Sequence, residues 1–579
     1  MTDIQQTQQN QFVLPTITRL LKQRGLSAQQ INEFFSWDLK ALPLLTGLKD
    51  LHKAAQRLIV AMEQKEKIGI YGDYDVDGTT SCALLYHFFQ YFEIEVELIQ
   101  PSRFIEGYGI HPPSIEKAWE QGIKVLVTVD CGITNSQAAT KANELGMDLI
   151  ITDHHKDALP EMPAAFAVVN PNRRDEDPQS PLVSLAGVGV AFALCLEIKN
   201  ILAKKEKVIP SLYPLLQFVA IGTICDLAKL NNMNLKLVRH GLKQIPNTQY
   251  PGILAFFTPE ERKRGFVPSE KLSFGIGPLI NSKGRLDHPE KALKLLIAND
   301  SSMAFENYVY LEVANKERKF IQANVVKEAK EQIIKNIQGP RHNISIAYQA
   351  DWHEGVIGIV ASKLVDNFKV PAVVFSDAAE AGIIKASART AGKLDLFDCL
   401  NQCKDLFIKF GGHKAAAGLS MTKENLPEFK RRLGKIIGDI PENLRTNLET
   451  YDLEISAEEI TPKLLKNLEC LEPFGMGNAK PLFKMTGIKL DSYDLLKDIH
   501  VRWNFSSIKN SKIKLKGISF NYIGKWGMED PATLYHNQNQ HHFSTERQQL
   551  TAYFTLAINH FNGNQYIQLM VEKVTSQFY

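Results

Sequence analysis

The 579-residue sequence lacks several features that would each restrict its class. No apolar run reaches the roughly 18 residues needed to cross a bilayer, and the start, MTDIQQTQQNQF, has neither the basic nor the apolar part of a secretory signal. The seven cysteines are scattered and form no CxxC pair, which argues against a disulfide framework or a zinc–cysteine site. The net charge of +3 does not mark a nucleic-acid binder. We expect a cytoplasmic globular protein.

The composition, 44% hydrophobic and 23% charged, is ordinary for a folded chain, and the length exceeds what one hydrophobic core serves. Short apolar runs alternate with helical stretches from 68 to 170, which predicts a parallel α/β sheet. A stretch without proline or glycine, Ser301–Ile337, predicts one long helix. We expect five parts: an N-terminal helical extension at 1–45, a parallel-sheet catalytic domain at 46–300, a long connecting helix at 301–338, a smaller α/β domain at 339–446 and a β-barrel at 447–579.

Polar side chains follow three of the expected strands and also interrupt one apolar stretch. The candidates are Asp73, Asp75 and Asp77 in IGIYGDYDVDGTT, Asp130 in VLVTVDCG, Asp153, His154 and His155 in LIITDHH, and Asp226 in FVAIGTICDLA. If the first segment stays extended, its three aspartates face one side. Alone, each motif is as readily a solvated turn, a helix cap or a core histidine.

Together these motifs indicate a metal site. Parallel topology brings the carboxyl ends of strands to one edge of a sheet. Carboxylates that crowd there repel one another unless cations neutralise them, and oxygen ligands favour Mg²⁺ or Mn²⁺. Two such ions suit phosphoryl transfer. The sequence therefore predicts hydrolysis of a phosphoester or phosphoanhydride.

GDYDVDG, VDCG, TDHH and the later Asp226 resemble the four motifs of the DHH phosphoesterase family. The resemblance implies two divalent cations, Mn²⁺ or Mg²⁺, and a catalytic set in which Asp73 lies beside the first metal and His155 contacts the scissile phosphate. The implied metal ligands are Asp75, Asp77, Asp130, which would bridge both ions, His154 and Asp226. Asp153 would orient a histidine, as metal ligands commonly require.

GGHKAAAG, residues 411–418, resembles the glycine-rich signature of the DHH-associated domain, and SART, residues 387–390, provides an arginine suited to phosphate. The resemblance implies a substrate-binding set that anchors a terminal 5′ phosphate. Its members are Arg285, His353, Arg389, Gly411, Gly412 and His413. Ser282-Lys283 and SART depart from the usual pattern of the family and put the contacts of Arg285 and Arg389 in doubt.

Three further segments, INSKGRLDHP (280–289), DWHEGVIGIVASK (351–363) and LEPFGMGNAKP (471–481), resemble the bacterial single-strand-specific exonucleases of this family. They imply 5′ to 3′ degradation of single-stranded DNA to mononucleotides, in recombination and repair. They also imply a monomer whose partners are a single-stranded-DNA-binding protein and a DNA helicase.

The last domain carries its own signal. Lys480–Lys525 holds ten Lys or Arg and three Asp with interleaved aromatic residues, which favours an OB-fold that binds single strands. The interleaved aromatic residues are Phe483, Tyr493, Trp503, Phe505, Phe520 and Tyr522, and most of them are expected in the core.

Two other functions remain open from the sequence. A DHH phosphoesterase for short oligoribonucleotides or dinucleotides would need only two domains, so the extra C-terminal residues argue against it. A non-catalytic DNA-binding scaffold would have lost metal ligands, whereas every expected ligand is present.

Overall fold

The fold is described from a computed structural model covering residues 14–102, 106–157, 159–285, 289–337, 342–446, 450–523, 525, 528–540, 549–561 and 564–577. The chain forms two compact units that do not follow chain order. The first comprises Gln29–Lys316 together with the short segment Leu471–Lys480. The second contains the described residues of Gln11–Ala28, Glu317–Cys470 and Pro481–Tyr579. Among the described residues, no helix is both long and apolar enough to span a membrane.

The first unit is built on a five-stranded sheet with the order β2-β1-β3-β4-β5 and parallel pairing throughout. Its strands lie in the region 68–170, where the alternating pattern predicted a parallel sheet. They are β1 (Ile68–Gly72), β2 (Val96–Ile99), β3 (Val125–Val129), β4 (Asp148–Thr152) and β5 (Ala167–Val169). Strand order reverses between β1 and β3, because β2 lies on one side of β1 and the later strands on the other. Open parallel sheets bind ligands at the carboxyl ends of strands beside such a reversal.

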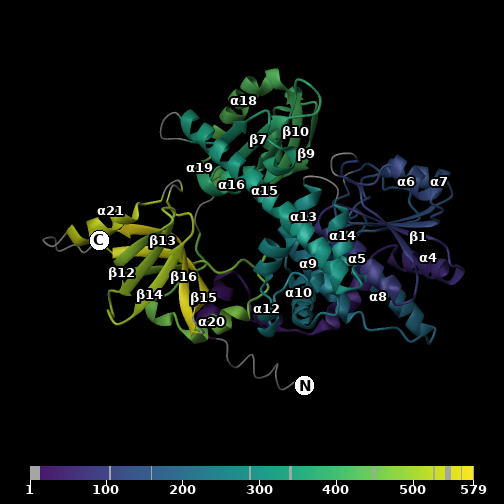
Figure 1. Cartoon of the computed structure of the whole chain (residues 1–579), viewed down its shortest axis with the longest axis horizontal. Coiled ribbons are helices and arrows are strands. Elements are labelled where there is room, and N and C mark those ends of the chain that lie inside the picture. The colour runs from purple at the N-terminus through teal and green to yellow at the C-terminus, as the bar shows by residue number, and fades with distance from the viewer. Residues whose placement is uncertain are drawn as a thin grey trace. The chain divides into compact units, whose positions relative to one another are not determined.

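Helices cover both faces of this sheet (Figure 1). The two helices α6 and α7 pack on Leu126 and Ile151, while α4, α5 and α8 pack on Val127 and Ile150, so successive strand residues enter opposite cores. The helices of this unit are α3 (Ala28–Phe35), α4 (Leu51–Gln64), α5 (Val76–Gln90), α6 (Pro112–Glu120), α7 (Ser136–Glu144), α8 (Gly187–Lys204), α9 (Leu216–Cys225), α10 (Asn232–Gln244), α11 (Pro251–Leu254), α12 (Pro259–Lys263), α13 (Gly277–Gly284) and α14 (Glu290–Leu296). A π-helix, Lys271–Ile276, precedes α13.

The predicted long helix is confirmed as α15 (Ser301–Asn336), which begins in the first unit and continues into the second. There it joins a mixed sheet with the order β6-β7-β8-β10-β9. The strands are β6 (Ser345–Tyr348), β7 (Ala372–Asp377), β8 (Ile383–Arg389), β9 (Lys409–His413) and β10 (Ala416–Thr422). One face packs on α16 (Glu354–Phe368) and α15, and the other on α17 (Leu396–Asn401) and α18 (Leu426–Gly438). Short α19 (Glu442–Arg445) follows.

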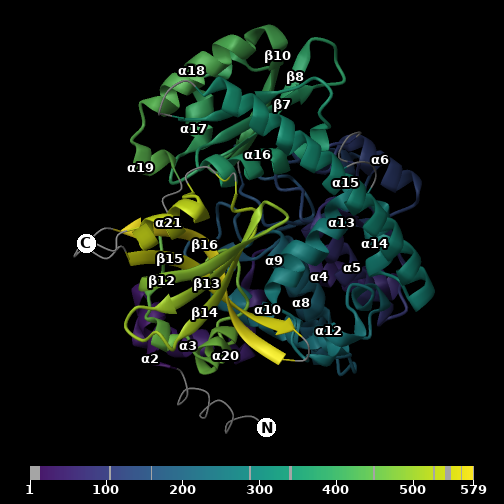
Figure 2. The same ribbon diagram turned by 60° about the vertical axis from the view of Figure 1, so that its left-hand side comes forward.

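The predicted terminal barrel is confirmed. Five strands close on themselves because β12 pairs with both β13 and β15, in the circular order β12-β13-β14-β16-β15 (Figure 2). They are β12 (Phe483–Leu496), β13 (His500–Ser507), β14 (Lys514–Ser519), β15 (Gln549–Phe561) and β16 (Asn564–Gln577), with β11 (Leu453–Glu454) beside β12 and helices α20 (Pro462–Glu469) and α21 (Pro531–Gln540).

The first described helix belongs to this barrel side of the chain. In α2 (Pro15–Gln23), Thr16 donates a hydrogen bond to Glu459 at 2.9 Å, and Arg24, just after the helix, pairs with Asp452 at 2.8 Å. The amide of Leu14 donates to Asn467 at 2.9 Å. The N-terminal helix is therefore joined to a segment more than 400 residues away in sequence.

Packing at Gly222 of α9 generates a stability prediction. An added Cβ would lie 2.5 Å from Oγ1 of Thr80 and 2.8 Å from Oδ1 of Asp77. Gly222→Ala should therefore lower the free energy of unfolding by about 1–3 kcal/mol through overpacking. Gly434→Ala in α18 is the matched control, because its Cβ would meet nothing within 4 Å. It should raise stability by about 0.5–1 kcal/mol. Urea denaturation checks both, and equal stability of the two variants would contradict the packing at Gly222.

Candidate metal centre

The loop after β1 turns into a helix sooner than the sequence pattern predicts. Strand β1 ends at Gly72, and α5 begins at Val76 because Asp75 caps it and accepts a hydrogen bond from the amide of Gly78 at 3.1 Å. A Cβ on Gly78 would lie 2.4 Å from the carbonyl oxygen of Asp73, so this tight turn needs glycine. The expectation that three aspartates share one side of an extended segment is wrong, since the last of them lies in the helix.

That last aspartate, Asp77, is fully buried and holds the start of α8. Its two carboxylate oxygens accept hydrogen bonds from the amides of Gly187 at 2.5 Å and Val188 at 2.9 Å. A Cβ on Gly187 would lie 2.7 Å from Cβ of Asp130, so the helix start also lies against a second carboxylate. The positive end of α8 thus stabilises negative charge at this edge of the sheet.

Asp130 follows β3 in a left-handed backbone conformation, with φ of 62°. Few residues other than glycine adopt this conformation, and such strained positions concentrate at functional sites. Its amide donates a hydrogen bond to the carbonyl of Thr152 in β4 at 3.0 Å, and its side chain is buried. The backbone therefore presents this carboxylate at the reversal point between β1 and β3.

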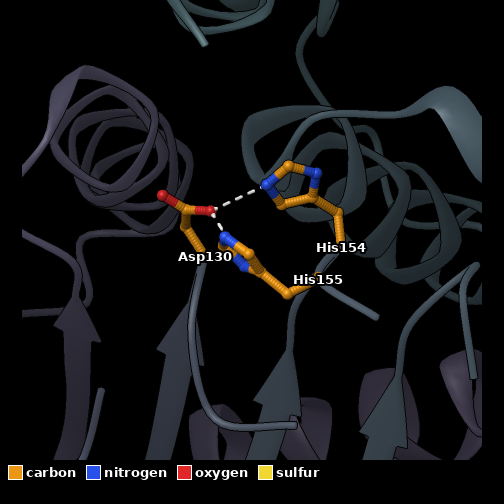
Figure 3. A group of neighbouring side chains, drawn as sticks. All are labelled: Asp130, His154 and His155. Carbon is orange, nitrogen blue, oxygen red and sulfur yellow. Dashed lines mark ion pairs between the residues drawn. The ribbon is translucent and has the colours of Figure 1, made fainter. Parts of the chain in front are cut away.

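Three carboxylates meet one nitrogen of His154. Its Nε2 lies 3.1 Å from Oδ1 of Asp130, 3.7 Å from Oδ2 of Asp77 and 3.8 Å from Oδ2 of Asp226, and it makes no hydrogen bond. The ring also forms a hydrogen bond with the backbone of Leu185. Figure 3 shows the rings of His154 and His155 turned toward the same oxygen of Asp130.

His155 has a different set of partners. Its Nδ1 lies 2.8 Å from Oδ1 of Asp153 and 2.9 Å from the hydroxyl of Tyr108. Asp153 is buried and also accepts hydrogen bonds from the amides of His154 at 2.7 Å, His155 at 3.0 Å and Ile133 at 2.9 Å. Asp153 therefore holds the ring of His155 and the backbone of both histidines.

The charges of the cluster explain its pKa values. Burial and the charge of His155 lower the pKa of His154 to about 4. Burial also lowers the pKa of His155, but the hydrogen bond and charge of Asp153 outweigh it and raise that pKa to about 9. Burial and neighbouring carboxylates raise the pKa of Asp77 to about 7 and that of Asp226 to about 9. These carboxyl groups would ionise more readily beside a cation.

The donor set fits divalent cations. Three groups of residues place one ligand atom each within 4.8 Å of one another: Asp73, Asp75 and Asp130; Asp77, His154 and Asp226; and Asp130, His154 and His155. Two buried atoms of these groups, Oδ1 of Asp130 and Nε2 of His154, have no hydrogen-bond partner. Buried acceptors that face one another without a donor are suited to a cation. Asp73 and His155 fall within these groups although the sequence prediction left them out of the ligand set.

Two residues that the sequence analysis did not identify, Asn170 and Asn172, form hydrogen bonds with the backbone of the two histidines. Asn170 follows β5 and donates from Nδ2 to the carbonyl of His155 at 2.9 Å, while Asn172 donates to the carbonyl of His154 at 2.7 Å. The amide of Asn172 in turn donates to Oδ1 of Asn170 at 2.6 Å. The only sequence signal was an amide directly after a buried strand, in VVNPN, at the edge where the acids gather.

The predicted phosphate-binding residues of the second unit share one sheet face. Arg389 pairs in register with Ala416, and Ala416 with His413, so their side chains lie on the same side of the sheet. Nη1 of Arg389 donates to Oγ of Ser387 at 2.9 Å. Among the described residues no carboxylate pairs with Arg389, and burial lowers its pKa. A half-buried guanidinium without an acid suits an anion.

The surroundings of Arg389 leave room for such an anion. Gly411 lies in β9, and a Cβ there would meet nothing within 4 Å. Gly412 has φ of 150°, and a Cβ would lie 2.5 Å from the carbonyl oxygen of Ala416. His353 caps α16 and accepts the amide of Gly355 on Nδ1 at 3.0 Å, which leaves Nε2 as the ring donor.

Arg285 ends α13 in the first unit. The preceding residue, Gly284, lies against the acidic loop, because a Cβ on it would be 3.5 Å from the carbonyl oxygen of Tyr74. The structure thus places Gly284, the residue before Arg285, beside the acidic loop, and the substrate contact of Arg285 stays a prediction.

The barrel retains only part of the basic excess expected on its surface. Three barrel cations have acidic partners, Lys484 with Glu454, Arg502 with Asp494 and Lys514 with Asp491. Lys480, which precedes the barrel strands, pairs with Glu270. Most of the aromatic residues are in the core, as predicted: Phe483, Trp503, Phe505 and Tyr522 are buried. Tyr493 is half-buried and Phe520 is 53% exposed.

Comparison with known proteins identifies the family. The model of the DHH family N-terminal domain matches residues 67–223, that of the DHHA1 domain matches 342–439 and that of the RecJ OB domain matches 451–573. The single-stranded-DNA-specific exonuclease RecJ of Escherichia coli is 30% identical over 579 residues, which cover 97% of this chain and 96% of that protein. The chain belongs to the RecJ family. The domain boundaries expected from the sequence stay predictions.

Other RecJ proteins differ in how much of their length is matched. The chain is 34% identical to RecJ of Bacillus subtilis over 88% of its own length but spans only 63% of that relative. The crystal structure of RecJ from Thermus thermophilus in complex with Mn²⁺ is similar at a TM-score of 0.73 and 25% identity, over 91% of this chain and 72% of that one. The RecJ-family architecture is therefore shared across nearly the whole described chain.

The asparagine support of the histidines generates a second prediction. Asn170→Asp keeps the acceptor for Asn172 but places an oxygen against the carbonyl of His155. Losing this buried hydrogen bond should cost about 1–3 kcal/mol of stability. Turnover should fall about tenfold or more, because a displaced reacting group can cost up to about 100-fold.

Asn143→Asp is the matched control. Asn143 is an exposed residue of α7, and its side-chain amide also donates a hydrogen bond to a backbone carbonyl, that of Ala164. Urea denaturation and single-turnover hydrolysis of an oligonucleotide measure the two effects. Equal turnover of the two variants would show that His155 keeps its place without the amide.

Proposed function

We propose that this chain is a metal-dependent exonuclease that degrades single-stranded DNA from its 5′ end to mononucleotides, in DNA recombination and repair. The observation that carries the proposal is the meeting of three carboxylates at the unbonded Nε2 of His154. Membership of the RecJ family supports the substrate, since its named relatives are single-stranded-DNA-specific exonucleases. We further propose that it works in the cytoplasm as a monomer.

In this proposal, two Mn²⁺ or Mg²⁺ ions are held by Asp75, Asp77, Asp130, His154 and Asp226, with Asp73 beside them. Similarity to a RecJ structure in complex with Mn²⁺ supports the choice of ion. When bound, such a pair neutralises the phosphate and makes water nucleophilic near neutral pH. The low pKa of His154 suits a ligand, because only neutral imidazole offers a lone pair.

His155 is proposed as the phosphate contact. Its pKa of about 9 keeps the ring protonated at neutral pH, and Asp153 takes the hydrogen bond from Nδ1. The second ring proton, on Nε2, is then available to a phosphate oxygen, where the positive charge stabilises the negative charge that develops during hydrolysis.

The direction of degradation is proposed to come from the second unit. Arg389 and His413 share one sheet face with the open position of Gly411, and the proposed ligand of this face is the terminal 5′ phosphate. His353 and the backbone of Gly411 and Gly412 complete the proposed pocket, with Arg285 contacting the strand in the first unit. The barrel would bind the trailing strand, and a single-stranded-DNA-binding protein and a helicase would supply it.

One oligonucleotide labelled separately at each end tests the polarity. With Mn²⁺ present, a 5′ label should be released at once as a mononucleotide, while a 3′ label should remain on progressively shorter products. A chelator should abolish both reactions, and Asp130→Asn, which removes the charge common to two of the ligand groups, should be inactive while folding normally. Release of the 3′ label first would overturn the polarity, and activity with chelator would overturn the metal.

Replacement of Arg389 tests the phosphate anchor. Arg389→Gln should raise KM for a 5′-phosphorylated strand about 10- to 100-fold, because a charged hydrogen bond contributes about 1.5–3 kcal/mol. The same change should have little effect on a strand with a 5′ hydroxyl. Arg431→Gln serves as the control, since Arg431 lies in the same unit but pairs with Glu428 at the surface. An equal loss on both substrates would assign Arg389 to folding of the sheet.

A further inference from the structure

The segment Leu471–Lys480 is part of the first unit, although the chain on both sides of it belongs to the second. We call these ten residues the strap. Arg239 of α10 donates a hydrogen bond from Nε to the carbonyl of Glu472 at 2.9 Å, and Lys480 pairs with Glu270 at 2.8 Å. The strap is thus attached at both of its ends to residues from the middle of the chain.

The centre of the strap lies on the loop that follows Asp226. The carbonyl of Met476 accepts a hydrogen bond from the amide of Leu230 at 2.7 Å. A Cβ on Gly475 would lie 2.9 Å from Cδ1 of Leu230, and one on Gly477 would lie 2.9 Å from Cγ of Lys229. The two glycines therefore let the strap backbone approach this loop more closely than other residues could.

The loop beneath the strap needs such support. Helix α9 ends at Asp226, and the next residue, Leu227, has φ of 59° and is 62% exposed. The amide of Leu227 donates a hydrogen bond to the carbonyl of Ile224, and the amide of Ala228 donates one to the carbonyl of Thr223. In this type of helix end, glycine usually occupies the position that Leu227 has here. A leucine in this conformation persists when surrounding contacts hold it.

The strap also supports the residue before Asp226, from the other side. One oxygen of Glu472, Oε2, accepts hydrogen bonds from Oγ of Ser269 at 2.7 Å and from the amide of Phe474 at 3.0 Å. Ser269 precedes the π-helix, in which the carbonyl of Leu272 lies 3.4 Å from Sγ of Cys225. Contacts that start from the strap therefore reach the chain on both sides of Asp226. They reach Lys229 and Leu230 directly, and Cys225 by way of Ser269 and the π-helix.

We propose that the strap is a positioning element for the metal centre, which fixes the carboxylate of Asp226 opposite His154. The inference rests on the proposed role of Asp226 as a metal ligand. Groups that orient metal ligands typically change affinity by about 10- to 100-fold when they are removed. Because the strap touches neither His155 nor Arg389 in any contact described above, its loss should act on metal affinity and leave strand binding unchanged.

Gly477→Ala in the full chain tests the proposal. The change strains a backbone with φ of 83° and pushes against Lys229. Calorimetric titration with Mn²⁺ alone should show one of two ions bound about tenfold more weakly. The Mn²⁺ concentration for half-maximal turnover should rise in proportion, KM for the oligonucleotide should stay the same, and excess Mn²⁺ should restore turnover. Gly265→Ala is the control, because φ there is 65° and its Cβ would meet nothing within 4 Å.

Glu472 provides a second pair of variants should Gly477→Ala not fold. Glu472→Gln keeps an oxygen for Ser269 and Phe474 and should bind Mn²⁺ as the unaltered chain does, whereas Glu472→Ala should weaken one ion. Unchanged Mn²⁺ affinity in folded Gly477→Ala or Glu472→Ala overturns the proposal. If the unaltered chain itself binds no Mn²⁺ and cleaves no DNA, the proposed function fails instead, so the two failures are distinguishable.

Discussion

Repulsion among buried carboxylates is the constraint on which the rest of this structure depends. Asp77, Asp130 and Asp226 all approach one nitrogen of His154, within 3.1–3.8 Å. Such a group is unstable by itself, because burial and like charge both oppose ionisation. The fold holds it together by placing strand ends, a helix start and a helix end at one point, where the strand order reverses between β1 and β3. A cation then stabilises a geometry that the protein has already formed.

The aspartates of the cluster differ in whether their carboxylate oxygens accept hydrogen bonds from backbone amides. Asp77 and Asp153 each accept backbone amides and hold other elements in place, α8 in one case and the two histidines in the other. Asp130 instead keeps a buried oxygen without any donor. Asp77 and Asp153 thereby also fix the geometry of the site, whereas this oxygen of Asp130 keeps its lone pairs for a cation. Asp153 thus keeps His155 charged while His154, one residue earlier, stays neutral.

Much of this was predictable because buried parallel strands are continuous apolar runs, and β1, β3 and β4 are each followed directly by their acids. The prediction for Asp77 was wrong in detail, since Asp75 starts a helix where an extended segment was expected. Asn170 was missed because its amide contacts a backbone carbonyl, which leaves no pattern of spacing in the sequence. The roles of all the site residues, Arg285, His353 and Arg389 among them, stay predictions.

The strap shows why chain order misleads about function here. PFGMGN was noted in the sequence as a family resemblance, and its position suggested part of the terminal domain. Its contacts instead reach Leu230, four residues after Asp226, and Ser269, both more than 200 residues earlier in the chain. A chain ending near residue 446 would therefore lose these contacts along with the barrel. Weak activity of such a fragment could reflect a displaced metal ligand as much as lost DNA binding, which is why single substitutions in the strap separate the two.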